Sequence, residues 1–159
     1  MSRLDQREHC STLSVIGWVL LTAASIPTTW AQSVGDQRAL ATIESLKDGV
    51  VERLAKCETK GRPDRSSLIV TGKNREPTIG RLQFQPRTVV NYTKLIEGRT
   101  IDRKEAVRIA LDDGKAANLA KKIIFEKNGL GNWHVCSKKL RLAPEVKRIQ
   151  SMVKQPLGL

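Results

Sequence analysis

Residues 54–61, LAKCETKG, determine how this chain is organised. Apolar residues recur at helical spacing through and ahead of this stretch: Leu40, Ile43, Leu46, Val50, Leu54 and Cys57. The spacing predicts a helix over residues 36–56 that ends near Cys57 and Glu58. Residues 59–67 are polar and contain a Gly and a Pro, which predicts a loop. The sequence therefore places a cysteine and a carboxylate at the end of a long helix, immediately before a loop.

The segment that follows the loop has the pattern of a small β-hairpin. Residues 67–71 are typical of a strand, and residues 72–74, GKN, are typical of a turn. Residues 78–84 return as a second strand or lead into the next helix. A short antiparallel pair is therefore expected between two helical regions.

The rest of the chain is predominantly helical in pattern. Helices are predicted, from start and stop signals that include Pro86 and an Asp-x-x-Glu capping box, over residues 86–96, 102–111, 116–127 and 144–153. Gly114 is expected to interrupt or end the second of these, and residues 131–133 are expected to form a turn. Taken together, the pattern predicts one α+β domain that is mainly α.

Length and charge limit the range of functions. The 159 residues fit one domain, and 40% of them are hydrophobic, which is enough for a packed core. The 28 Lys and Arg residues outnumber the 16 Asp and Glu residues, so that the net charge is +12 and an anionic partner is indicated. Three Cys and two His residues are too few for a zinc finger, and no cofactor is predicted.

The N-terminal segment has the layout of a secretory signal peptide. Arg3 and Arg7 precede an apolar run at residues 13–24, and residues 29–31, TWA, fit a cleavage site after Ala31. The run is short for a membrane span, although an uncleaved anchor is the alternative. We therefore expect a secreted or periplasmic protein with no stable membrane span after cleavage. Its predicted parts are a signal peptide (1–31), a main domain (32–140) and a basic C-terminal helix or tail (141–159).

Cleavage would leave two cysteines and one histidine. Cys57 and Cys136 are expected to form a disulfide in an oxidising compartment, two buried free thiols being the alternative. His134 is expected to be a partly buried structural residue. With a single histidine, a Ser-His-Asp triad or a multi-histidine metal site is hard to build, and no metal is predicted.

Three segments carry a resemblance to known families. They are CETKGRP at residues 57–63, GRLQFQPRT at 80–88 and WHVC at 133–136. The first two resemble the lysozyme-like lytic transglycosylases, which have a Glu-Ser segment and a later Gly-Leu-Met-Gln-Leu-Met-Pro-x-Thr segment. All three resemble the resuscitation-promoting factors, whose segments are Cys-Glu-Ser-Gly-Gly, Gly-Gly-Leu-Gln-Phe and Trp-Pro-Val-Cys. The resemblance spans roughly residues 54–136.

The resemblance implies a lysozyme-like domain that binds peptidoglycan glycan strands as a monomer. It implies that Glu58 is the general acid and base that cuts the β-1,4 bond between N-acetylmuramic acid and N-acetylglucosamine, leaving a 1,6-anhydro product. Gln83 would hold an N-acetyl group or a hydroxyl, and Gly80 would let the backbone approach the glycan. Thr59 stands where these families have Ser, and Thr78 stands where they have an aromatic. All four are therefore candidate substrate-binding residues.

Other interpretations of the same residues stay open. Glu58 could be a solvated carboxylate at a helix end, Gln83 could bond the local backbone, and Gly80 could serve a plain turn. A hydrolytic muramidase would need a second carboxylate, for which Asp64 and Glu76 are candidates. A non-catalytic wall-binding protein on the same scaffold is a further alternative.

The sequence departs from the pattern of these families at some positions, and other features argue against further functional assignments. The aromatic residue that these families usually have near Gly61 is absent, and so is the Ala-Tyr-Asn-Ala motif of many lytic transglycosylases. Phe84 and Trp133 are expected in the core rather than as sugar platforms. A nucleic-acid partner is not predicted, because aromatic residues are few and no binding motif is present.

Overall fold

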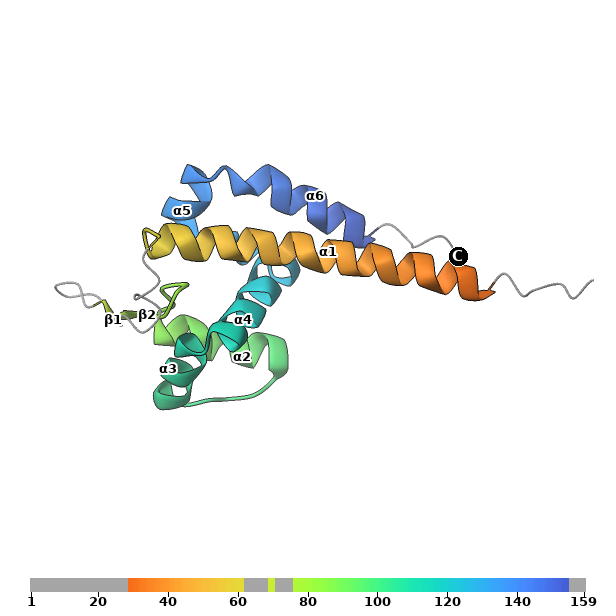
Figure 1. Cartoon of the computed structure of the whole chain (residues 1–159). Coiled ribbons are helices and arrows are strands. Elements are labelled where there is room, and N and C mark those ends of the chain that lie inside the picture. The colour runs from red at the N-terminus through yellow and green to blue at the C-terminus, as the bar shows by residue number, and fades with distance from the viewer. Residues whose placement is uncertain (1–28, 62–68, 71–75, 155–159) are drawn as a thin grey trace, which may run out of the picture.

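The structure is a computed structural model that describes residues 29–61, 69–70 and 76–154 (Figure 1). The elements run in the order α1 (Thr29–Glu58), β1 (Ile69–Val70), β2 (Thr78–Ile79), α2 (Pro86–Glu97), α3 (Arg103–Leu111), α4 (Asp113–Glu126), η2 (Gly129–Trp133), α5 (His134–Lys139) and α6 (Leu142–Lys154). The described part of the chain is thus mainly helical with one small antiparallel sheet, which confirms the predicted class at this level.

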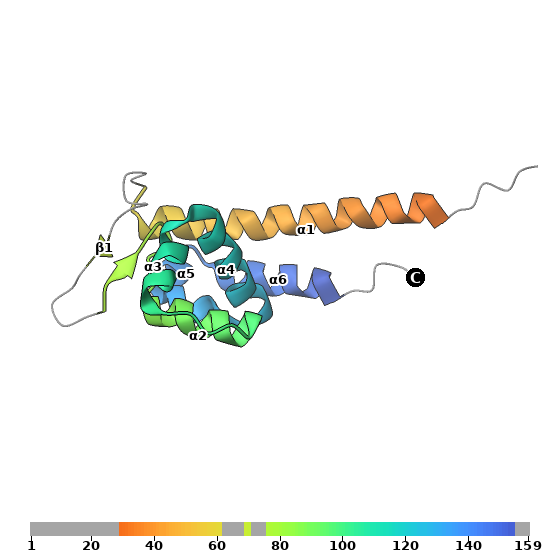
Figure 2. The ribbon, with the colours of Figure 1, turned by 90° about the horizontal axis from the view of Figure 1, so that it is seen from below.

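The helices form two groups on either side of α1. Helix α6 lies antiparallel along one side of α1, with α5 beside the C-terminal end of α1, whereas α2 and α3 lie on the other side and α4 connects them to α1 (Figures 1 and 2). The first turns of α1 project beyond the rest of the molecule in both views. The centre of the core is made of fully buried residues from α1, α4 and α6, among them Val50, Leu54, Ile123, Ile124, Leu142 and Ile149.

Helix α1 ends where the sequence predicts and begins earlier. Its buried stripe includes Ile43, Val50 and Leu54, as the spacing requires. The helix is closed by Gly61, whose N–H donates to the Lys56 carbonyl over 2.8 Å and whose φ of 73° is readily adopted by glycine. Its first residue, Thr29, precedes the predicted cleavage site, while most of the predicted signal peptide lies outside the described residues.

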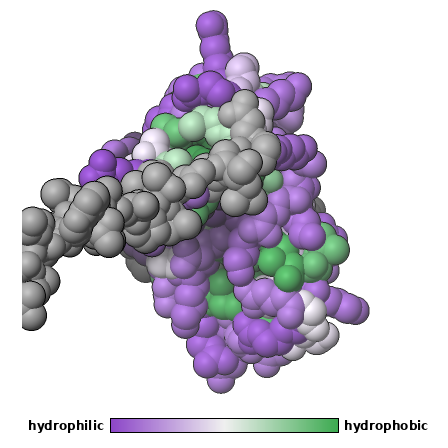
Figure 3. Space-filling view, turned by 90° about the vertical axis from the view of Figure 1, so that its right-hand side faces the viewer, coloured by the Kyte–Doolittle hydropathy of each residue, from purple (hydrophilic) through white to green (hydrophobic). Residues whose placement is uncertain are grey.

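No helix in the described ranges is both long and apolar enough to cross a membrane. Figure 3 shows the end of the molecule at which α1 begins. The part of this face that is not covered is mostly hydrophilic, with apolar side chains in separate small areas.

Local capping explains the helices on the far side of α1. Pro86 occupies the first turn of α2, and the carboxylate of Asp102 accepts the Glu105 N–H over 2.7 Å at the start of α3. The expected break at Gly114 is wrong by two residues. Asp112 ends α3 and caps α4 by accepting the Lys115 N–H over 3.0 Å, so that Gly114 falls inside the first turn of α4.

Two details near the C-terminus differ from the prediction. The turn expected at residues 131–133 is part of the 3-10 helix η2, which continues directly into the unpredicted helix α5. Helix α6 begins at Leu142 rather than at Pro144. Proline is tolerated there because an N–H in the first helical turn has no intrahelical acceptor.

The predicted hairpin is present but short. Strands β1 and β2 pair in antiparallel fashion, Ile69 opposite Ile79 and Val70 opposite Thr78. The second strand stops at Ile79 because the chain turns back on itself, and Ile79 and Phe84 exchange two backbone hydrogen bonds of 2.9 Å across the turn. The turn expected at residues 72–74 lies outside the described residues.

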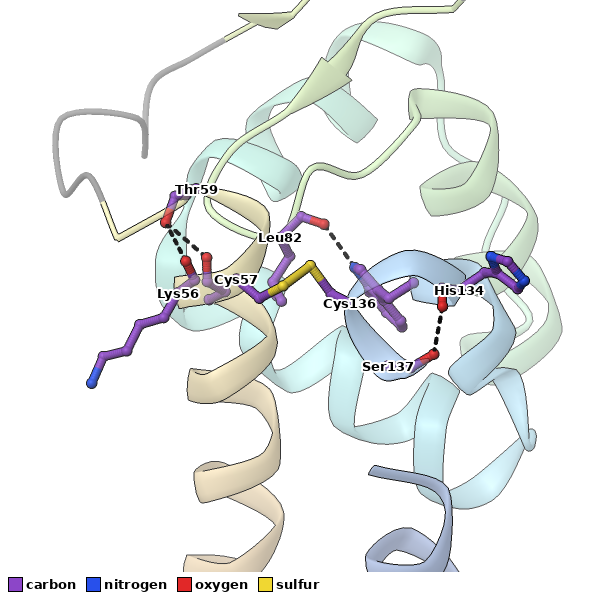
Figure 4. The surroundings of a disulfide bond; sticks show 9 residues. Lys56, Cys57, Thr59, Leu82, His134, Cys136 and Ser137 are labelled. Atoms are coloured by element: carbon purple, nitrogen blue, oxygen red, sulfur yellow. Dashed lines mark hydrogen bonds between the residues drawn. A yellow bond between two sulfur atoms is a disulfide. The ribbon is translucent and has the colours of Figure 1, made fainter. Parts of the chain in front are cut away.

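The predicted disulfide is confirmed. Cys57 and Cys136 are bonded, with their Cα atoms 5.8 Å apart, although 79 positions separate them in the sequence (Figure 4). The bond joins the last turn of α1 to α5. The alternative of two free thiols is therefore wrong.

Candidate active site

A pocket of about 470 Å³ lies at the C-terminal end of α1. Three segments that are distant in the sequence line it: Glu58, the region from Thr78 to Thr88, and residues 132–135. Each of the three motifs of the sequence analysis contributes to this lining. The pocket contains the predicted residues Glu58, Thr78 and Gln83, but neither Gly80 nor Thr59 lines it.

Glu58 is the acidic residue of this pocket. It is the last residue of α1 and is half-buried, and no described residue forms an ion pair or a hydrogen bond with its carboxylate. Burial raises the pKa of the Glu58 carboxyl, because the charged form loses hydration when it is removed from water. A larger share of this carboxyl is therefore protonated near neutral pH than of an ordinary glutamate.

Gln83 is held in one orientation beside Glu58. The Thr78 hydroxyl donates to Gln83 Oε1 over 2.6 Å, and Gln83 Nε2 donates to the Gly80 carbonyl over 2.8 Å. The backbone at Gln83 has a φ of 50°, so the side chain projects from a tight turn. An amide has two donor hydrogens and two acceptor lone pairs, so one of each remains for a ligand. Gln83 can therefore bond the local backbone and still bind a ligand.

The structure gives Gly80 a packing role. Its φ is 72°, and a Cβ at this position would stand 2.0 Å from the carbonyl oxygen of Ala110 in α3. Only a residue without a side chain allows the turn to approach α3 so closely. This contact accounts for the glycine as a turn residue, without any approach to a glycan.

The Thr59 hydroxyl is committed to its own helix. The residue is buried, and its Oγ1 donates to the Ala55 carbonyl over 2.8 Å, with a longer contact to the Lys56 carbonyl (Figure 4). The side chain therefore closes the end of α1 and supports the neighbouring Glu58 indirectly.

Two aromatic residues form the floor of the pocket, as expected for core residues. Phe84 and Trp133 are 2% and 4% exposed, and their rings meet edge to face with centroids 5.2 Å apart. The Trp133 indole N–H donates to the Leu82 carbonyl over 2.7 Å. This bond ties the turn that carries Gln83 to η2, just as the disulfide ties the Glu58 end of α1 to α5.

The expectation for His134 is wrong. The residue is exposed rather than partly buried, and in Figure 4 its ring points away from the disulfide. It lines the pocket next to Val135, whose side chain is 74% exposed. Because α5 starts at His134, the backbone of this rim is fixed while both side chains stay accessible.

Other lining residues were not singled out from the sequence. Gln85 and Thr88 belong to the GRLQFQPRT segment, which could have indicated them. Asn132 donates from Nδ2 to the Tyr92 hydroxyl over 3.1 Å and to the Gly129 carbonyl over 2.7 Å. Nothing in its local sequence marks it, because these partners come together only in the fold.

Neither candidate for a second carboxylate is found beside Glu58 in the described part of the chain. Glu76 interacts with Arg87 and Arg103 at 3.8 and 3.7 Å and lies in a different surface hollow. Asp64 lies outside the described residues. Over the ranges that the structure covers, Glu58 is the only acidic residue lining this pocket, and no group of three or more His, Cys, Asp or Glu residues is arranged to hold a metal ion.

The chain matches no protein-family model, no curated protein and no solved structure.

Proposed function

We propose that this protein is an exported lytic transglycosylase that cuts peptidoglycan glycan strands with Glu58 as its general acid and base. The observation that carries the proposal is the environment of Glu58, a half-buried carboxyl of raised pKa without a described ionic partner. It lies in the same pocket as the hydrogen-bonded Thr78 and Gln83 pair. A carboxyl whose pKa is raised keeps its proton to higher pH than an ordinary glutamate, which favours a role as an acid.

The proposed reaction needs one carboxyl and no water. Protonated Glu58 gives its proton to the glycosidic oxygen as the bond from C1 of N-acetylmuramic acid breaks. The resulting carboxylate then takes the proton of the C6 hydroxyl of the same sugar, and O6 bonds to C1. The products are a 1,6-anhydro end and a free 4-hydroxyl, and Glu58 returns to its protonated form.

The proposed lysozyme-like arrangement rests on the order of the parts. A helix ends in the acidic residue, a short hairpin follows, and a tight turn presents Gln83 before the remaining helices. The disulfide and the Trp133 bond to Leu82 keep the walls of the pocket together. A rigid pocket that presents one acid and one oriented amide suits a substrate rich in hydroxyl and N-acetyl groups.

The test is digestion of purified peptidoglycan in water enriched in oxygen-18, followed by mass spectrometry. We expect anhydro-muropeptides without the label. Labelled reducing ends would instead show the hydrolytic muramidase reaction, and intact strands with a bound protein would show the non-catalytic alternative.

Substitution of Glu58 is the companion experiment. Glu58→Gln keeps the shape of the side chain and removes the transferable proton, so we expect cleavage to fall by a factor of about 10² to 10⁴. Glu76→Gln is the matched control, because it makes the same change outside the pocket and is expected to retain cleavage. Wild-type cleavage by Glu58→Gln would overturn the proposal, provided that circular dichroism shows both variants folded.

A further inference from the structure

The cations of this protein are distributed unevenly over its surface. Residues 134–154, which form α5 and α6, contain six Lys and Arg residues and one acidic residue, Glu145. Residues 36–58 in α1 contain four basic and five acidic residues, and residues 86–126 contain nine basic and six acidic ones. The excess of positive charge is therefore densest on the α5–α6 layer.

The six cations of this layer are exposed. We call them the α5–α6 basic face: Lys138, Lys139, Arg141, Lys147, Arg148 and Lys154. None of the six forms an ion pair with a carboxylate in the described part of the chain. The neighbouring Glu145 is already engaged by Arg53 of α1 at 2.6 Å, so it does not neutralise them.

The fold does not need these side chains. Helix α6 packs on the core through Leu142, Val146 and Ile149, which are on the opposite face from Lys147 and Arg148. In contrast, many of the basic residues elsewhere meet carboxylates, as Arg81 meets Glu52 at 2.8 Å and Lys121 meets Asp48 at 2.8 Å, although Lys94, Lys104 and Arg108 form no ion pair within the described ranges. Six like charges gathered on one layer repel one another, and a bound polyanion relieves this repulsion.

The α5–α6 layer begins at the rim of the pocket. Helix α5 begins at His134, on the rim of the pocket, and α6 then runs back along α1 (Figure 1). The 13 residues of α6 span about 20 Å at 1.5 Å per residue. The basic residues thus follow the chain from the rim of the candidate active site along the exposed side of α6, over a length that suits an extended ligand.

We propose that the α5–α6 basic face binds a linear phosphodiester polymer of the bacterial wall, next to the glycan strand in the pocket. The wall as the source of the polymer rests on the proposed function, whereas the polyanion site does not. Nucleic acid is the less suitable ligand, because residues 138–154 contain no aromatic side chain on which bases could stack. Phosphate groups without bases require only the charges that this face supplies.

The experiment compares two triple variants of the whole chain that lose the same charge. Lys147→Gln, Arg148→Gln and Lys154→Gln remove half of the basic face. Lys94→Gln, Lys104→Gln and Arg108→Gln remove three exposed cations from α2 and α3, on the other side of α1. Binding of purified poly(glycerol phosphate) is measured by titration at several salt concentrations, with single-stranded DNA of equal charge as the second ligand.

We expect the α6 variant to bind the polymer about tenfold more weakly than the wild type at low salt, with the slope of log K against log salt reduced by about 2. The α2–α3 variant is expected to bind as the wild type does. Equal losses in the two variants, or none, would overturn the site, and tighter binding of DNA than of the polymer would overturn the assigned partner.

The active-site variant separates this proposal from the proposed function. Glu58→Gln is expected to bind poly(glycerol phosphate) as tightly as the wild type, because Glu58 is not part of the basic face. The α6 variant is expected to cleave short soluble glycan fragments at the wild-type rate. Binding without cleavage in the wild type would overturn only the enzymatic proposal, and cleavage without binding would overturn only the basic-face site.

Discussion

The carboxylates in two pockets of this protein have opposite surroundings. The pocket at the end of α1 contains Glu58, which has no ionic partner among the described residues. The second pocket, of about 300 Å³, is formed by α2, α3 and α4 and contains Glu97 and Glu105. There Arg99 pairs with both carboxylates, and Lys122 lies 3.6 Å from Glu97.

The two pockets differ in what raises the pKa values of their charged groups. In the second pocket the hydrogen bond from Arg99 to Glu105 is the main cause that raises the pKa of the arginine. In the first pocket burial alone raises the pKa of Glu58. Burial disfavours the charged form of a carboxyl that has no counterion among the described residues, and groups with perturbed pKa values concentrate at functional sites. This difference is the reason why the proposed chemistry is assigned to the first pocket rather than to the second.

Loss of the disulfide tests how much the bond beside the first pocket contributes to the stability of the fold. We expect Cys57→Ser with Cys136→Ser to lower the free energy of unfolding by about 2–5 kcal/mol, because the bond closes a loop across most of the described chain. Urea denaturation of the oxidised wild type and the double variant measures this loss. Added reductant is expected to move the wild-type midpoint and to leave that of the variant unchanged. Equal midpoints for both oxidised proteins would contradict the role of the bond.

Gly80 tests the fit of the turn that carries Gln83. We expect Gly80→Ala to cost about 1–3 kcal/mol, because the new Cβ meets the Ala110 carbonyl and the backbone has a positive φ. Gly131→Ala is the matched control, since its Cβ would have no neighbour within 4 Å. Thermal unfolding of both variants is the measurement, and similar losses in the two would show that the turn tolerates a side chain.

Local signals in the sequence predicted the elements well where one residue controls a boundary. Pro86 and Asp102 mark the starts of α2 and α3 as expected, because caps act over one helical turn. The predicted helix end at residue 111 agrees with α3, but the break itself is at Asp112 and not at Gly114, because the carboxylate of Asp112 accepts a backbone hydrogen bond at the start of α4. Such competition between two nearby signals is not resolved by spacing alone.

Two residues of the candidate site could be named from the sequence, but the contacts of the site could not. Glu58 and Gln83 could be named from the motifs, and the structure brings them to one pocket. Thr59 turns out to bond its own helix, and the exposure of His134 was missed. The Thr59 bond is local, because its acceptor is the carbonyl four residues earlier in α1. The exposure of His134 depends instead on how α5, which follows η2, packs against the end of α1, a contact between residues far apart in the sequence.

The pH dependence of stability tests the environment of Glu58 independently of activity. Its pKa is raised in the folded protein above the ordinary value of 4.5, so the folded state holds a proton that the unfolded state releases. Stability is then lost as the pH rises from the ordinary value through the raised one. We expect Glu58→Gln to be as stable as the wild type at pH 3 and more stable at pH 7, as measured by chemical denaturation at each pH. A wild type that is the more stable protein at pH 7 would show that the carboxylate has a stabilising partner.

Arg99 provides the smallest expected effect and completes the contrast with Glu58. Its side chain is exposed, and exposed ion pairs contribute little because water and salt screen them. We expect Arg99→Gln to cleave peptidoglycan within about twofold of the wild-type rate, since surface changes away from a site are close to neutral. The thermal midpoint should change little, and less still at high salt, where the pairs with Glu97 and Glu105 are already weakened. A loss of cleavage comparable to that of Glu58→Gln would move the proposed chemistry to the second pocket, because Arg99 lines that pocket and not the first.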